Sequence, residues 1–72
     1  MFRSQAVAAE TNKTLLHVAA LLNDSVRVVR DSASDEELAA YRLRVGAVMS
    51  EILEMLNLLY AAHPQIKPDG LS

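Results

Sequence analysis

SDEELAAYRLRVGAVMSEILEMLNLLYAAHP, residues 34–64, is the stretch that decides the fold. Ser34 is followed three residues later by Glu37, the spacing of a capping box, in which each side chain bonds the free backbone N–H group of the other residue. Pro64 has no backbone N–H, and its ring disfavours helical geometry at His63. The stretch therefore predicts one long helix over residues 35–63.

Apolar side chains recur along this helix at alternating steps of three and four, the spacing of a packed helical seam. The seam consists of Leu38, Tyr41, Val45, Val48, Ile52, Met55 and Leu59. A second set widens the apolar arc beyond what one neighbouring helix covers: Met49, Leu53, Leu56 and Tyr60. We therefore expect this helix to need more than one helical neighbour.

The preceding segment, residues 4–31, is also periodic and has Ser4 as its predicted N-cap. Its main apolar face is Ala8, Thr11, Leu15, Val18, Ala19, Leu22, Val26 and Val29, and a row spaced by sevens lies beside it, Val7, Thr14, Leu21 and Val28. The break between the two helices is short, so they must lie antiparallel as neighbours. Val18 is then expected opposite Val48, and Leu22 opposite Val45.

Composition supports an all-α chain. The 72 residues are 51% hydrophobic and include two Gly, two Pro and no Cys, which leaves no disulfide or thiolate metal site. We expect a single helical-hairpin domain over residues 1–72, with residues 64–72 as an extended or frayed tail from which Ile66 folds back. We expect no membrane span, because no uninterrupted apolar run reaches about 18 residues, and hence a cytoplasmic protein.

An isolated hairpin would leave its outer apolar rows in water, so we expect a homodimer that forms a four-helix bundle. The expected self-association interface is Arg42, Gly46, Met49, Leu53, Leu56, Tyr60, Leu21 and Val28. Gly46 either marks a close helix crossing or fits under one large side chain. Arg42 either bonds across the subunit boundary or covers apolar surface with its stem.

No arrangement of residues predicts catalysis, a metal or a cofactor. His17 has no acid at ligand spacing, and Glu51 and Glu54 point away from the apolar arc. His63, at a helix end, suits the negative end of the helix dipole. The serines lie at caps, on a helix flank or in the tail, and no Gly-rich phosphate loop is present. We therefore do not expect an enzyme.

Residues 40–49 and 59–68, AYRLRVGAVM and LYAAHPQIKP, combine Tyr-Arg, Val-Gly and Met with a later Leu-Tyr, His-Pro and second Pro. This pattern resembles that of small uncharacterised bacterial helical-hairpin proteins. The resemblance implies a stand-alone helical protein and carries over no functional residue. In architecture, two equal helices joined by a tight turn are similar to the plasmid copy-control protein Rop, a dimeric four-helix bundle that binds RNA.

Three functions are open at this point. The favoured one is a homo-oligomeric module for protein–protein interaction or assembly, which binds itself and another protein. The alternative is a Rop-like nucleic-acid-binding bundle, which the net charge of −2 disfavours and which would need six basic residues on one face: Arg3, Lys13, Arg27, Arg30, Arg42 and Arg44. The third is a ligand-binding or catalytic bundle whose cavity forms between subunits around Met49, Met55 and Tyr60.

Overall fold

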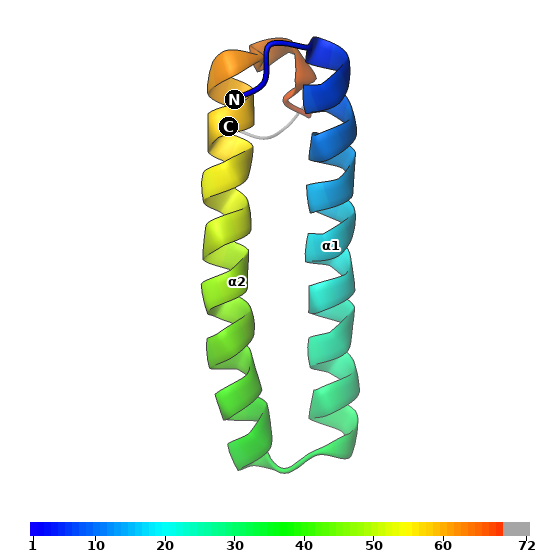
Figure 1. The fold of residues 1–72 in the computed structure, drawn as a ribbon. Helices are drawn as coiled ribbons and strands as arrows, with labels where there is room; N and C mark the ends of the chain where they lie inside the picture. Colours follow the sequence, from blue (N-terminus) through cyan, green and yellow to red (C-terminus); the bar gives the residue numbers. More distant parts are fainter. Residues whose placement is uncertain (69–72) are drawn as a thin grey trace.

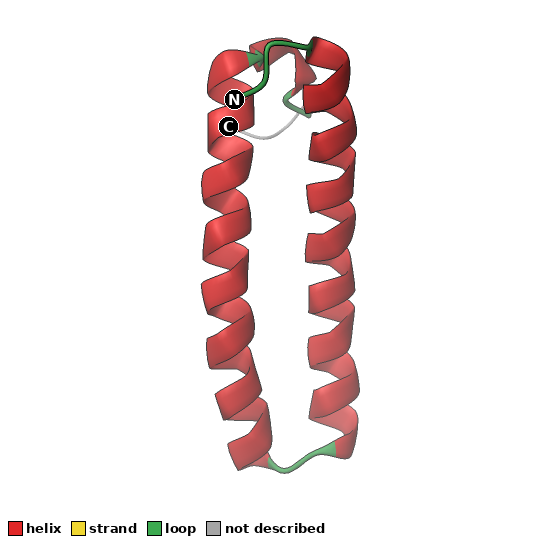
Figure 2. Ribbon diagram, viewed as in Figure 1, coloured by secondary structure: helices red, strands yellow, loops and turns green. Residues whose placement is uncertain are grey.

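The computed structural model describes residues 1–68, which form two antiparallel helices and one short 3-10 turn (Figure 1). Helix α1 spans Gln5–Ser32 and helix α2 spans Asp35–Ala62, with 28 residues each. A short connection joins them, and the described residues contain no strand (Figure 2). The predicted all-α hairpin is confirmed, and its helix bounds are within one residue of those expected.

The predicted caps are present at both helix starts. The Ser4 hydroxyl accepts a hydrogen bond from the backbone N–H of Val7 at 3.2 Å. At α2 the capping box is complete, because the Glu37 N–H donates to the Ser34 hydroxyl at 3.2 Å and the Ser34 N–H donates to the Glu37 carboxylate at 3.0 Å. These bonds satisfy backbone groups that the first helical turn leaves free.

The described segments that flank the two helices, residues 1–4 and 63–68, lie together at the end of the hairpin opposite the connection (Figure 1). The N-terminal residues pass toward the end of α2, where a ring nitrogen of His63 lies 2.9 Å from the Phe2 carbonyl oxygen. The 3-10 turn, Pro64–Ile66, contacts α1 through a 2.7 Å hydrogen bond from the Gln65 amide nitrogen to the Gln5 amide oxygen. This end of the hairpin is therefore closed by the residues before α1 and by the 3-10 turn after α2.

The structure corrects part of the prediction made for residues 64–72. Residues 64–66 form a 3-10 turn where an extended or frayed tail was expected. Ile66 packs against the core, as expected. Residues 69–72, the rest of the predicted tail, lie outside the described residues.

The core is thin and lies along one stripe of each helix. The buried apolar side chains are Ala8, Val45, Ile52, Leu56 and Leu59. All but Val45 form one cluster, and the partly buried side chains packed against it are Leu15, Leu22, Met49, Tyr60 and Ile66. Three residues predicted to face inward are exposed: Val18, Val48 and Met55, at 37%, 47% and 36% of their surface. The predicted seam is therefore wrong at these positions, and the helices are turned so that Leu56 and Met49 face inward.

We expect Glu37→Gln to reduce the loss of stability at acid pH. The bonds from Ser34, first that from its backbone N–H, hold the pKa of the Glu37 carboxyl below its ordinary value of 4.5. The stabilisation is therefore present above pH 4.5 and is lost as the pH falls through the lower folded-state value. Circular dichroism melts over this range measure the effect.

Glu36→Gln is the matched control, because Glu36 lies in the same first turn but is not part of the capping box. Its melts should keep the acid dependence of the unmodified protein. Equal acid slopes for Glu37→Gln and the unmodified protein would contradict the proposed role of the capping box.

Candidate functional site

Two polar contacts between the helices define the two faces of the hairpin. On one face, the Ser25 and Tyr41 hydroxyl oxygens are 2.6 Å apart. On the other, the Tyr60 hydroxyl donates to the Asn12 amide oxygen at 2.6 Å. Ser25 lies three residues after the core residue Leu22, whereas Asn12 lies three residues before the core residue Leu15. These opposite offsets place the two contacts on opposite flanks of the core stripe of α1.

The Ser25–Tyr41 contact brings two exposed apolar rows together. Val18 lies seven residues before Ser25 and Val48 seven residues after Tyr41, so Val18 and Val48 share rows with the two bonded hydroxyls. Met55 continues the row of Val48, while Leu21 and Val28 lie one turn after Val18 and Ser25, on the side away from the core. Together with Val7, these residues form what we term the Val18/Val48 face: Val7, Val18, Leu21, Val28, Val48 and Met55.

This face is the largest set of exposed apolar side chains in the described residues. Its members expose between 36% and 65% of their surface, Met55 the least and Val28 the most. Along its edge on α2 runs a row that follows Tyr41, Val48 and Met55 by three residues: Arg44, Glu51 and Leu58. Arg44 and Glu51 are exposed, and neither forms an ion pair within residues 1–68. The site is therefore an apolar strip with one positive and one negative charge at its border, neither of them in an ion pair within residues 1–68.

The opposite face, beside the Asn12–Tyr60 contact, is less apolar. Its exposed large apolar side chains are Leu16 and Leu53, at 37% and 57%, with Leu43 at its edge at 75%, and Gly46 lies seven residues before Leu53. A Cβ atom added at Gly46 would have no neighbour within 4 Å. Gly46 therefore does not fit under a large side chain within the hairpin, which removes one of its two interpretations.

The structure divides the predicted interface residues into three groups. Leu21 and Val28 lie on the Val18/Val48 face, whereas Arg42, Gly46 and Leu53 are exposed on the opposite flank. Leu56 is 5% exposed, and Met49 and Tyr60 pack against the same core. The expectation that Met49, Leu56 and Tyr60 remain uncovered by the hairpin is therefore wrong. The eight residues do not form one continuous surface.

Sequence reasoning missed Val18, Val48 and Met55 as surface residues. The neighbours Val48 and Met49, like Met55 and Leu56, are both apolar, so periodicity alone does not select which of them faces inward. The sequence does contain a signal for the inward side of each helix, and it comes from polar residues. Asn12 and Tyr60 each carry a group that needs a partner when buried, and pairing them turns their side of each helix inward.

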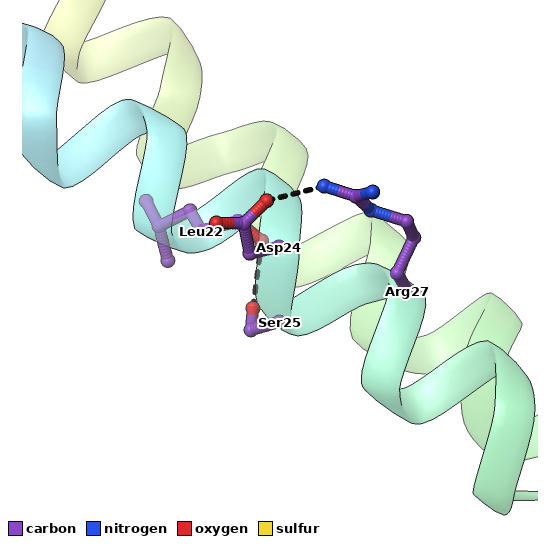
Figure 3. A network of polar contacts seen from close by, with 4 residues as sticks. All are labelled: Leu22, Asp24, Ser25 and Arg27. Carbon is purple, nitrogen blue, oxygen red and sulfur yellow. Dashed lines mark hydrogen bonds and ion pairs between the residues drawn. The ribbon is translucent and has the colours of Figure 1, made fainter.

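Most basic side chains on α1 are already paired with acids from the same helix. Arg27 bonds Asp24 on the outer side of α1, next to the Ser25 hydroxyl that donates to the Leu22 carbonyl (Figure 3). Lys13 lies 3.8 Å from Glu10, and Arg30 lies 3.3 Å from Asp31. Exposed pairs of this kind contribute about 0–1 kcal/mol to stability, but they neutralise the charges that a phosphate backbone would need.

The two histidines lie in different environments, and Glu51 and Glu54 share that of His17. His17, Glu51 and Glu54 are exposed. His63 is 8% exposed, and its ring faces the Phe2 carbonyl. Its backbone N–H, as expected for the end of a helix, bonds the Leu59 carbonyl. His63 is therefore the C-cap residue of α2, as expected, and its imidazole also contacts the N-terminal segment.

Helix α2 is long and apolar enough to cross a membrane by length and composition, although charged residues interrupt its apolar runs. The expectation counted uninterrupted apolar residues, whereas an 18-residue window with at most two charges meets the averaged criterion. Only 22% of that window is buried in the hairpin. Core helices of soluble proteins pass the same test, so the cytoplasmic location stays a prediction.

The fold and the exposed strip define the chain as an antiparallel helical hairpin with one uncovered apolar face. No protein-family model matches the chain, and no curated protein or solved structure matches it. The two resemblances given above therefore stay expectations.

We expect Tyr60→Phe to lower the free energy of unfolding by about 1–3 kcal/mol, because it leaves the buried Asn12 amide oxygen without a partner. Combining it with Asn12→Leu should recover most of that loss, since both polar partners are then gone. Chemical denaturation of the two variants measures the difference. A double variant less stable than Tyr60→Phe alone would contradict the importance of this pair.

The same side chain predicts a pH effect at the alkaline end. Burial raises the pKa of the Tyr60 hydroxyl above its ordinary value of 10.0. Stability should therefore be retained below pH 10.0 and fall as the pH rises through the folded-state value. Alkaline melts of Tyr60→Phe should lose part of this dependence, whereas melts of Tyr41→Phe should keep it. If the pH dependence were kept in Tyr60→Phe and reduced in Tyr41→Phe, this role of Tyr60 would be contradicted.

Proposed function

We propose that this chain is a small homo-oligomeric helical protein that acts as a module for protein–protein interaction or assembly, without catalysis, in the cytoplasm. In this proposal two hairpins pair as a homodimer and form a four-helix bundle, which offers its outer surface to a further protein. The observation that supports the proposal is the Val18/Val48 face, an apolar strip that runs along both helices and is not covered by the hairpin.

The thin core supports the need for a partner. Within residues 1–68 only five apolar residues are buried, one of them the small Ala8. Chains of this size rarely gain more than about 3–5 kcal/mol from a single core, and those without disulfides or metals often obtain the rest by oligomerisation. Covering a side chain that is already half buried adds roughly 1 kcal/mol, and the six of the Val18/Val48 face would be covered on both copies. A second hairpin is the partner of matching length and apolar character.

The Rop-like alternative has less support. Lys13, Arg27 and Arg30 are paired with acids of α1. Arg42 and Arg44 lie on opposite flanks of α2, because they are two residues apart on a helix. No single face of the hairpin therefore gathers the six basic residues that this function requires.

We expect the unmodified protein to sediment as a dimer at micromolar concentration and to melt at a temperature that rises with concentration. Leu21→Asp should raise the dissociation constant at least about tenfold, because it places a charge in an apolar contact. Leu43→Asp is the matched control: Leu43 is 75% exposed on the outer surface of α2, and the substitution should leave the dissociation constant unchanged.

A monomer mass for the unmodified protein would overturn the proposal. Two binding experiments separate the other possible occupants of the face. Co-sedimentation with vesicles of mixed neutral and anionic lipids that is lost in Leu21→Asp would indicate a membrane surface in place of a second copy. A salt-dependent mobility shift with duplex RNA would favour the Rop-like function.

A further inference from the structure

We propose that the second copy packs on the Val18/Val48 face with the twofold axis perpendicular to the helices. This orientation places each Arg44 beside Glu51 of the partner subunit. The inference rests on the proposed function, since it specifies the orientation of the same dimer. It assigns a role to the two border charges that have no ion pair within residues 1–68.

The arrangement of the apolar rows supports this axis. The row on α1 has a valine near each end, Val7 and Val28. A perpendicular twofold reverses each helix against its own copy, so Val7 meets Val28 of the partner subunit and Val48, near the middle of α2, meets its own copy. The two helices have 28 residues each, so the reversed hairpins overlap along their full length.

The border charges complement each other under the same reversal. Arg44 lies four residues before Val48, and Glu51 lies three residues after it. Reversal about Val48 therefore brings Arg44 within about one residue, or about 1.5 Å along the axis, of Glu51 of the partner subunit. Symmetry repeats the contact, so the dimer contains it twice. Each contact pairs opposite charges at the edge of an apolar interface, where such charges set register and orientation.

The competing arrangement has its twofold axis parallel to the helices. It stacks α1 of one copy on α2 of the other and places the two copies of α2 on a diagonal of the bundle. Arg44 then faces α1 of the partner subunit, near Leu21, and cannot reach Glu51. The two short connections also lie at the same end of the bundle, whereas the proposed arrangement places them at opposite ends.

Charge reversal tests the ion pair. Arg44→Glu and Glu51→Arg should each raise the dimer dissociation constant about tenfold or more, because each creates two like-charge contacts. The double variant restores opposite charges and should return to within about threefold of the unmodified protein. Arg42→Glu, on the opposite flank, is the matched control and should change little. If the double variant instead weakens the dimer by the sum of the two single effects, the proposed ion pair between Arg44 and Glu51 is wrong.

The orientation has an independent readout. A spin label on Glu36→Cys, an exposed position beside the connection, reports the distance between the two ends by double electron–electron resonance. The proposed arrangement predicts about 40 Å, the length of a 28-residue helix. A dimer with labels within about 20 Å would overturn the orientation and leave the proposed function intact. A monomer in the same sample would instead overturn the proposed function.

Discussion

Each helix of a two-helix hairpin has one neighbour, and this constraint governs the rest of the structure. A helix packed on one side buries only a narrow stripe of its circumference. Helix α2 is apolar well beyond such a stripe, so some of its large side chains must remain in water. The hairpin buries Val45, Ile52, Leu56 and Leu59 of α2 and leaves Val48, Leu53 and Met55 exposed.

Two polar pairs mark how each helix is rotated about its own axis. This rotation decides which apolar side chains are buried. The Asn12–Tyr60 bond turns the flank of Leu56 inward near the closed end, and the Ser25–Tyr41 contact holds the opposite flank near the connection. The Asn12–Tyr60 bond matters most for stability, because Asn12 is buried and a buried polar group without a partner costs about 1–3 kcal/mol. The same rotation places Val18 and Val48 at the surface. The Val18/Val48 face is thus exposed because the rotation that pairs Asn12 with Tyr60 turns the opposite flank of each helix outward.

Much of the fold could be predicted from the sequence, because its signals are local. Ser4, Ser34 and Pro64 act on groups within one helical turn, and the structure has helix ends within one residue of those expected. The candidate site could not be predicted in the same way. Val48 and Met49 are about 100° apart on the helix and equally apolar, so the inward choice depends on contacts between residues far apart in sequence. Asn12 and Tyr60, 48 residues apart, are such a contact.

We propose that two copies meet at the Val18/Val48 face, and isotope-filtered NMR on a mixed dimer tests this proposal most directly. With one copy labelled and the other unlabelled, the account predicts intermolecular contacts between the methyl groups of Val48 and its own copy, and between Val7 and Val28. Intermolecular contacts confined to Leu16 and Leu53, on the opposite face, would contradict it.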